Sequence, residues 1–204
     1  MEVIRRGAEA EIRAGEWKGR KVLIKTRTVK GYRHPDIDAD IRNQRTRNEA
    51  RLIQEARKLG VPTPIIYDID LERAELVLQD VGRKRVKDAL MDASDDDIPY
   101  ICREIGRLAA LLHSGKMVHG DLTTSNMILS DGRIWLIDFS LGNRNATIEE
   151  MGVDMHLLRE AFLSAHSEII DRFQEVLDSY AEHCPFHEEV FKKVRQIEAR
   201  GRYT

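Results

Sequence analysis

A polar loop followed by an apolar hairpin, between Val118 and Gly142, constrains the fold of this chain more than any other stretch. Two apolar runs, Met127-Ile128-Leu129 and Ile134-Trp135-Leu136-Ile137, are separated by the turn residues Ser130-Asp131-Gly132. The pattern predicts two buried strands joined by a tight turn. Such a hairpin is rigid, so side chains at its two ends would be held in fixed positions.

Three side chains with oxygen atoms stand near the ends of this hairpin. Asn126 enters the first strand, Asp138 follows the second, and Asp121 lies on the loop just before. Two carboxylates and an amide suit Mg²⁺ bound together with nucleotide phosphates, and they do not suit Zn²⁺. Ordinary turn residues are the alternative interpretation, but the strand context favours a functional site. The arrangement predicts phosphoryl transfer, in which positioning and charge neutralisation supply most of the catalysis.

Length and composition are typical of a compact enzyme. The 204 residues can bury a core as one domain or as two small lobes. Because 33 basic residues face 35 acidic ones, the net charge of −2 points to neither nucleic acid nor membrane as a partner of the whole molecule. No apolar run approaches the ~18 residues of a membrane span, and the charged N-terminus has no signal-peptide core. Cys102 and Cys184 are far apart, which favours reduced thiols and a cytoplasmic protein.

The N-terminal third is expected to consist mainly of strands. They are predicted over Ile4 to Ile12, Val22 to Lys25, Ile65 to Asp70 and Glu75 to Val81. A turn is expected at Glu16 to Gly19, and Gln79 to Gly82 reads as a connector between two lobes. An apolar run that ends in Lys25 is typical of a buried strand that delivers one ammonium group to a cleft, although a solvated strand end is the alternative.

One helix is predicted between these strands. The charged stretch Thr26 to Arg47 reads as a mobile loop, and the spacing of apolar residues predicts a helix from about Asn43 to Leu59. Glu49 lies close to the inward face of this helix, from which it could reach Lys25 and fix the ammonium group. Glu55 is the competing candidate, and a solvent-facing Glu49 is the remaining alternative.

The rest of the chain is expected to be mostly helical. Asp95-Asp96-Asp97 offers a capped start for a helix whose apolar stripe ends at Ser114-Gly115. Further helices are predicted from about Asp154 to Ala165, Glu168 to His183 and Glu188 to Ala199. The predicted fold class is therefore α+β, with a strand-rich lobe over residues 1–82 and a helical lobe over residues 83–204.

The motifs follow one another in an order typical of protein kinases. The chain resembles the protein-kinase signature set in three motifs, VLIK (22–25), HGDLTTSN (119–126) and DFS (138–140), with Glu49 between the first two. This resemblance covers nearly the whole chain. The resemblance is strongest to the small atypical kinases related to the RIO kinases, and above all to the PRPK family of KEOPS (EKC) kinase subunits. The segments that show this resemblance are GAEAEI, RTRNEARLIQEARKLGVPTP, HGDLTTSNMIL and the tail EARGRYT. The resemblance implies a two-lobed kinase-like fold with a reduced helical C-lobe.

The resemblance also implies a role for each matching residue in the use of ATP and Mg²⁺. Lys25 would hold the α- and β-phosphates and pair with Glu49. Asp121 would accept the proton of the substrate hydroxyl as the catalytic base. Asn126 and Asp138 would bind Mg²⁺.

Other residues of the nucleotide site follow from the same resemblance. Gly7 and Ala8 in the nucleotide loop, and Gln79 and Val81 in the connector, would contact the nucleotide. Asp154 resembles the aspartate that braces the catalytic loop from below, although the N-cap of a helix would explain it equally well.

Departures from the kinase pattern indicate a specialised enzyme. Gly120 stands where many kinases have arginine, so no guanidinium is available there to bind an activation-loop phosphate. Only 13 residues separate Ser140 from Asp154, and no APE triplet occurs, so a platform for peptide docking is small or missing. Gly7 is alone in the nucleotide loop and Glu9 adds a negative charge, so ATP affinity is expected to be modest and partner-dependent.

The expected function is that of a Mg-ATP-dependent atypical serine/threonine protein kinase or ATPase within the KEOPS complex, which supports threonylcarbamoyladenosine modification of tRNA. The resemblance implies two protein partners, the threonylcarbamoyltransferase subunit and a small helical subunit. The basic tail favours a contact with tRNA or the transferase, although a solvated helix end is the alternative. Its basic residues are Lys192, Lys193, Arg195, Arg200 and Arg202.

Two other functions remain open. Small-molecule phosphotransferases of the aminoglycoside and choline kinase type share HGDL followed by Asn, but the 65 residues after Phe139 leave little room for a substrate pocket. A pseudokinase that binds nucleotide without turnover is the second. The complete set of Lys25, Asp121, Asn126 and Asp138 argues against it.

Overall fold

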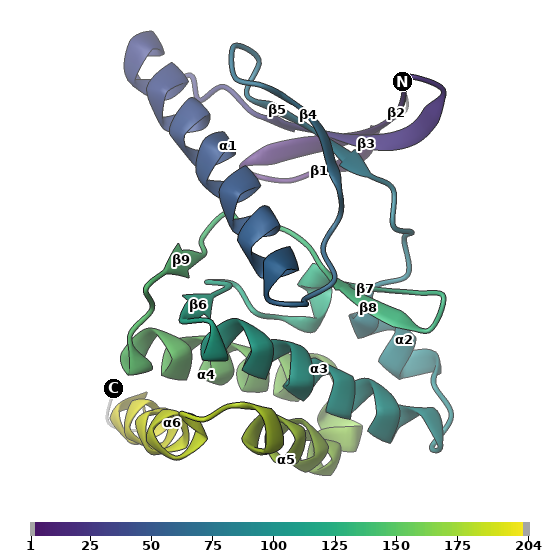
Figure 1. Cartoon of the computed structure of the whole chain (residues 1–204), viewed down its shortest axis with the longest axis vertical. Helices are drawn as coiled ribbons and strands as arrows, with labels where there is room; N and C mark the ends of the chain where they lie inside the picture. The colour runs from purple at the N-terminus through teal and green to yellow at the C-terminus, as the bar shows by residue number, and fades with distance from the viewer. Residues whose placement is uncertain (1–2, 202–204) are drawn as a thin grey trace.

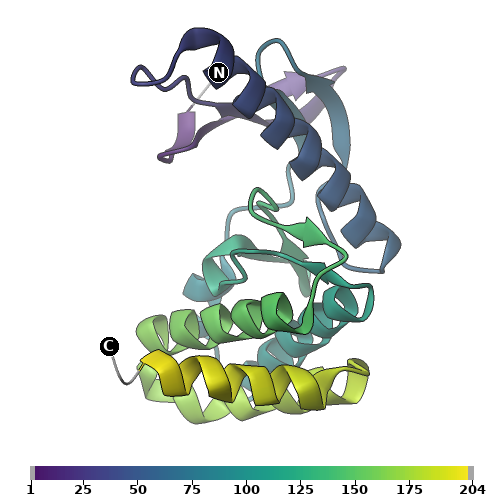
Figure 2. The ribbon, with the colours of Figure 1, turned by 90° about the vertical axis from the view of Figure 1, so that its left-hand side faces the viewer.

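The computed structural model describes residues 3–201, and the predicted tail residues Arg202, Tyr203 and Thr204 lie outside this range. Figure 1 shows a sheet and one long helix at one end of the molecule and a group of stacked helices at the other. A small hairpin lies between them. The turned view in Figure 2 shows the same separation into two parts.

The N-terminal part is a five-stranded antiparallel sheet with the order β1-β2-β3-β5-β4. Its strands are β1 (Val3–Arg6), β2 (Ala10–Trp17), β3 (Arg20–Arg27), β4 (Ile66–Asp70) and β5 (Glu75–Gln79). The predicted turn at Glu16 to Gly19 is too long, because strand pairing continues to Trp17 and Arg20. Lys18 and Gly19 alone make the turn, with φ of 48° and 78°, and positive φ at both central positions suits the twist of a two-residue hairpin.

Helix α1 (Pro35–Lys58) begins well before the predicted start at Asn43, so the mobile loop predicted over 26–47 is mostly wrong. Proline at the start of the helix and acidic residues in its first turn favour this earlier beginning. Asp38 is buried there and its carboxylate binds Arg42 at 2.7 Å and Arg33 at 3.4 Å. Part of the charge in this stretch is therefore used in ion pairs within or next to the helix.

The central hairpin is confirmed. A short 3-10 turn, η1 (Thr124–Asn126), leads into β7 (Met127–Ser130), which pairs with β8 (Arg133–Leu136). A second small pairing joins β6 (Met117–Val118) to β9 (Asn143–Arg144). The two pairings bring both ends of the polar motif together.

The C-terminal part is helical, as predicted, and contains one helix that the sequence analysis missed. Its elements are α2 (Val86–Asp92), α3 (Asp97–Ser114), α4 (Ile148–Ala165), η2 (Ser167–Arg172), α5 (Phe173–His183) and α6 (His187–Gly201). Helix α3 packs on α5, and α4 packs on α6. The missed helix α2 is short, and it packs against η1 and β7 through the buried Val86, Ala89 and Leu90.

The main core lies beneath the hairpin. One buried apolar cluster joins helix α3 to the hairpin, and it includes Leu108 and Leu112 of α3 and Met127, Ile134 and Leu136 of the hairpin. This burial anchors the hairpin, so the polar residues at its ends rest on a rigid base. Within residues 3–201, none of the helices combines the length and the apolar composition needed to cross a membrane.

The alternative interpretation of Asp154 as the N-cap of a helix is wrong, because helix α4 begins earlier. The helix begins six residues earlier than predicted, at Ile148, and Thr147 is its N-cap. The Thr147 side chain accepts a hydrogen bond from the Glu150 backbone, and Glu150 reaches back to the backbone of Thr147, which makes a capping box. Asp154 is buried within the helix, so it is no N-cap and must be explained by its contacts.

Candidate active site

A cavity of about 340 Å³ lies between the sheet and the hairpin. One end of it is polar, where Lys25, Glu49, Asn126 and Asp138 meet. Much of the remaining lining is apolar and includes Ile12, Leu23, Leu78, Val81, Ile128 and Ile137. An apolar pocket with a few convergent polar groups at one end suits a ligand with a flat ring and a charged tail.

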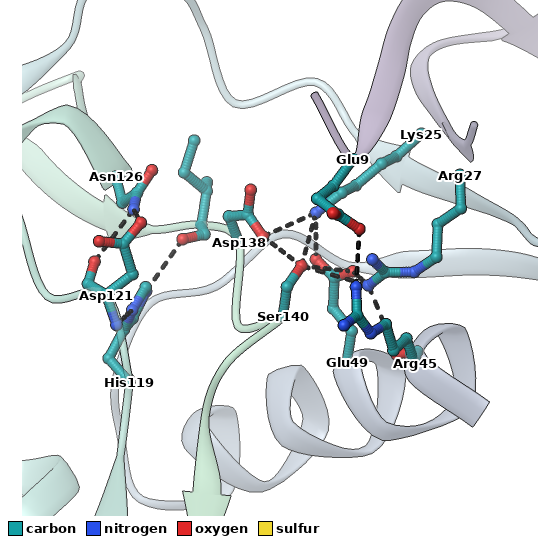
Figure 3. Close-up of polar contacts among 11 residues, drawn as sticks. Glu9, Lys25, Arg27, Arg45, Glu49, His119, Asp121, Asn126, Asp138 and Ser140 are labelled. Carbon is teal, nitrogen blue, oxygen red and sulfur yellow. Dashed lines mark hydrogen bonds and ion pairs between the residues drawn. The ribbon is translucent and has the colours of Figure 1, made fainter. Parts of the chain in front are cut away.

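Lys25 is buried at the polar end and touches two carboxylates (Figure 3). Its Nζ atom lies 2.6 Å from Glu49 Oε1 and 2.8 Å from Asp138 Oδ1. Burial lowers the pKa of Lys25, but the carboxylates of Glu49 and Asp138 outweigh it, so the pKa is raised above its ordinary value and the amine is charged. The predicted pair with Glu49 is present. The competitor Glu55 instead lies 3.1 Å from Lys58.

Arg27 is a site residue that the sequence analysis missed. Its Nη2 atom lies 2.6 Å from Glu49 Oε2, so the buried Glu49 carboxylate holds one cation on each oxygen. Arg27 stands two residues after Lys25 on β3, and alternate residues of a strand face the same side. That spacing was the signal that could have identified it.

Asp138 has an unusual backbone conformation. Its φ of 64° lies in the left-handed region, which aspartate tolerates better than most residues and which is common at functional sites. The Ser140 hydroxyl donates a hydrogen bond to Asp138 Oδ1 and lies 3.2 Å from both Lys25 Nζ and Arg27 Nη2. Burial raises the pKa of Asp138, but the Lys25 ammonium and the Ser140 hydrogen bond more than offset this and hold the pKa well below its usual range. The carboxylate is therefore ionised and able to bind a cation.

Asn126 connects Asp121 to the cavity (Figure 3). Its Nδ2 atom donates to Asp121 Oδ2 at 2.7 Å and to the Asp121 carbonyl at 3.0 Å. The amide oxygen of Asn126 is left as the end that could face a metal ion. Asp121 itself is not among the residues that line the cavity, and it reaches the site through this amide.

Asp154 holds the loop that carries Asp121. Its carboxylate accepts hydrogen bonds from the backbone N–H groups of His119 at 2.6 Å and Gly120 at 2.9 Å. Gly120 has a φ of 79°, and a Cβ atom there would lie 2.1 Å from the Leu141 carbonyl oxygen. This backbone therefore leaves no room for a side chain such as the arginine found here in many kinases.

The predicted nucleotide loop is the turn between β1 and β2. Gly7 N donates to the Ala10 carbonyl at 2.9 Å, and neither Gly7 nor Ala8 is among the residues that line the cavity. Glu9 Oε2 binds Arg45 Nη1 of α1 at 2.6 Å. The negative charge of Glu9 is thus paired with α1.

The predicted connector residues do line the cavity. Val81 is buried against it, and Gln79 lines it while its Oε1 atom accepts a hydrogen bond from the Ile65 backbone at 3.2 Å. The Gln79 backbone N–H is engaged as well, since it donates a hydrogen bond to the Ile65 carbonyl at 2.8 Å.

The donor set at the polar end fits Mg²⁺ better than a transition metal. Among the residues that the structure describes, no group of three or more His, Cys, Asp or Glu side chains could hold a metal ion alone. Asp138 and the amide oxygen of Asn126 supply only part of a coordination shell. Mg²⁺ is commonly held by one or two such groups, with phosphates and water as the remaining ligands.

Comparisons with known proteins agree with this geometry. The RIO domain family matches residues 16–158. The chain is 40% identical over its full length to the KEOPS complex subunit Bud32 of Pyrococcus abyssi, and the match covers 96% of that protein. It is also 40% identical over its full length to a probable bifunctional tRNA threonylcarbamoyladenosine biosynthesis protein of Methanothermobacter thermautotrophicus, of which it spans 37%.

A solved structure shows the same architecture. The Rio2 kinase of Chaetomium thermophilum, in its ADP/Mg²⁺-phosphoaspartate complex, matches with a TM-score of 0.66 at 15% identity, over 100% of this chain and 72% of that one. This likeness confirms the predicted kinase-like fold class.

Proposed function

The chain belongs to the RIO domain family of atypical kinases, and from this premise we propose that it is a Mg-ATP-dependent serine/threonine protein kinase or ATPase. The observation that supports the proposal most directly is the convergence of Lys25, Glu49 and Asp138 at the polar end of the cavity. A fixed ammonium next to an ionised carboxylate suits the phosphates and the metal ion of a nucleotide.

Each residue contributes one step to this chemistry. Asn126 and Asp138 would hold Mg²⁺, which supplies neutralisation of phosphate charge when it is bound. Lys25 would bind phosphate oxygens while Glu49 keeps its ammonium group in place. Asp121, held by Asn126, would accept the proton of the attacking hydroxyl or water.

The two lobes follow from the same proposal. We place their boundary at Gly82, with the N-lobe over residues 1–82 and the C-lobe over residues 83–204. The Lys84 carbonyl already accepts a hydrogen bond from Leu129 N at 2.8 Å, so the chain after Gly82 is tied to the hairpin. Gly7, Ala8, Gln79 and Val81 would contact the nucleotide from the N-lobe side.

The partners in this proposal are those of a KEOPS kinase subunit. The relative in Pyrococcus abyssi is named as a subunit of this complex, and the relative in Methanothermobacter is named for threonylcarbamoyladenosine biosynthesis. We therefore include the threonylcarbamoyltransferase subunit, a small helical subunit and tRNA as partners. In the tail, Lys193 pairs with Glu149 at 3.1 Å, while Arg202 lies outside the described residues.

The direct test is ATP turnover by the purified chain. We expect ATP consumption that requires Mg²⁺ and yields ADP with phosphoprotein or free phosphate, at a rate that partner subunits increase. Adding an aminoglycoside or choline as acceptor should not change the rate, because little of the chain remains to build a pocket for them. Absence of Mg²⁺-dependent turnover, with and without partners, would leave a nucleotide-binding pseudokinase.

Arg27 should matter for stability as well as for the site. We expect Arg27→Met to lower the free energy of unfolding by about 1–3 kcal/mol, because it leaves one oxygen of the buried Glu49 carboxylate without its cation while Lys25 keeps the other. Arg27→Lys, which keeps the charge, should cost less. The control is Arg6→Met, since Arg6 pairs with Glu11 at 2.7 Å but is exposed, and an exposed pair contributes about 0–1 kcal/mol. Urea denaturation of the variants measures this, and equal losses at both positions would contradict it.

A further inference from the structure

Two other arginine side chains line the cavity without a counter-ion. Arg5 comes from β1, and Arg85 comes from the segment between β5 and α2. Among residues 3–201, no carboxylate lies within the 4.0 Å of an ion pair from either guanidinium group. Both side chains are at least partly exposed at the mouth of the cavity.

Neighbouring arginines are neutralised by acidic residues. Arg6 binds Glu11 at 2.7 Å, and Arg83 binds Asp80 at 2.9 Å with a second, shorter contact. Of the three described arginines that line the cavity, Arg83 is thus neutralised, whereas Arg5 and Arg85 are not.

The two unpaired groups line the same cavity although they come from opposite lobes. Burial and the positive charge of Arg5 lower the pKa of Arg85, and the nearby Asp88 only partly compensates. Two like charges held close together without a counter-ion are unfavourable unless an anion neutralises them. The fold thus maintains a local excess of positive charge at the cavity mouth.

The position of this pair separates it from Lys25. Arg5 lies opposite Ile12 in the β1–β2 pairing, and Ile12 lies opposite Lys25 in the β2–β3 pairing. Residues directly opposite in antiparallel strands point to the same face, so Arg5 and Lys25 share the cavity face of the sheet, two strand spacings or about 10 Å apart. Arg85 faces this region from below, where its backbone pairs with Ile128 of β7.

We propose that Arg5 and Arg85 form a second anion site at the mouth of the cavity, which takes a phosphate group distinct from the phosphates held by Lys25. Guanidinium groups suit phosphate oxygens because they donate paired hydrogen bonds in a fixed plane. The phosphate is carried either on the ribose of the bound nucleotide or in the backbone of an RNA strand that crosses the cavity mouth. The proposal rests on the proposed function, in that it takes Lys25 as the site of the ATP phosphates.

The experiment compares three probes on the full chain with Mg²⁺: ADP, ADP carrying an extra phosphate on its ribose, and a single-stranded RNA oligonucleotide. The variants are Arg5→Gln, Arg85→Gln and the double variant. Arg6→Gln is the matched control, because it removes an arginine of the same strand that has its own carboxylate partner. Calorimetric titration gives the affinities, and thermal melting verifies that each variant is folded.

We expect the affinity for the second phosphate to fall by about tenfold for each arginine removed, the size of one lost charge-assisted hydrogen bond. The affinity for ADP should stay within about twofold, and the control Arg6→Gln should retain the affinities of the parent chain. A response limited to the phosphorylated ADP identifies the ribose as the source. A response limited to RNA, with a steep salt dependence, identifies a nucleic-acid backbone.

Equal affinities of the parent chain and the double variant for both phosphate-bearing probes would overturn the proposal. Losses of the same size in Arg6→Gln would overturn it as well, because they would show a general effect of charge. If the parent chain failed to bind ADP, the proposed function would be in doubt, and the RNA titration would still test the arginine pair by itself.

Discussion

The Asp138→Ala variant is expected to lose all Mg²⁺-dependent ATP turnover and to remain folded. Among residues 3–201, Asp138 supplies the one carboxylate that lines the cavity and is still partly exposed to a ligand, since Glu49 is occupied by two cations. Its pKa is held well below the usual range, chiefly by Lys25 and against the effect of burial, so it is charged at every pH at which the enzyme would work. Removing it leaves Asn126 alone to hold the metal ion.

The fold should survive because the buried contacts of Lys25 are redundant. Without Asp138, the ammonium group keeps Glu49 at 2.6 Å as a partner. We expect the midpoint of thermal unfolding to change little. The affinity for ADP without Mg²⁺ should be retained. The increase in ADP affinity that Mg²⁺ normally causes should vanish.

A matched control is available in the same segment. Asp131 occupies the exposed turn of the hairpin, also with a positive φ, of 51°. Asp131→Ala should turn over ATP at the rate of the parent chain. Residual Mg²⁺-dependent turnover in Asp138→Ala, at saturating nucleotide, would contradict the assignment of Asp138 to the metal ion.

Much of this site was predictable because its spacing is local. Asp121, Asn126 and Asp138 lie within one stretch, and the apolar runs between them predicted the hairpin that now sets their positions. Helical spacing placed Glu49 near the inward face but left Glu55 as a competitor, and the kinase resemblance implied the pair with Lys25 that the structure contains.

The errors occurred where tertiary contacts outweigh local patterns. Sequence spacing predicts too late a start for α1 because a charged stretch resembles a loop, whereas the buried Asp38 is neutralised by Arg42 and Arg33 only once the helix forms. Helix α2 was missed because seven residues are too few for a clear period, and its stability comes from packing on β7 and η1.

The contacts of Arg27, Glu9 and Arg45 could not be read from the sequence for a similar reason. Arg27 and Glu49 are separated by 22 residues, and Glu9 and Arg45 by 36. Which of many charged residues pair depends on how the sheet packs against α1. Only the alternation along β3 suggested that Arg27 points the same way as Lys25.

The second large effect is expected at Asp121. Replacing it with asparagine should lower turnover by roughly 10²- to 10⁴-fold, the usual range for loss of a general base. Asparagine keeps the size of the side chain and an oxygen that can still accept the hydrogen bond from Asn126 Nδ2, which is now 2.7 Å long. It cannot accept a proton. The loss would therefore report proton transfer and not the position of Asn126.

The comparison of the two aspartates separates metal binding from base catalysis. Asp121 does not line the cavity, so Asp121→Asn should bind Mg-ADP like the parent chain, within about twofold, whereas Asp138→Ala should not gain affinity from Mg²⁺. Asp131→Asn serves as the control for the same chemical change in the exposed turn. If Asp121→Asn turned over ATP at the parent rate, the base would have to be sought elsewhere. If it lost the Mg²⁺ effect instead, Asp121 would belong to the metal site together with Asn126.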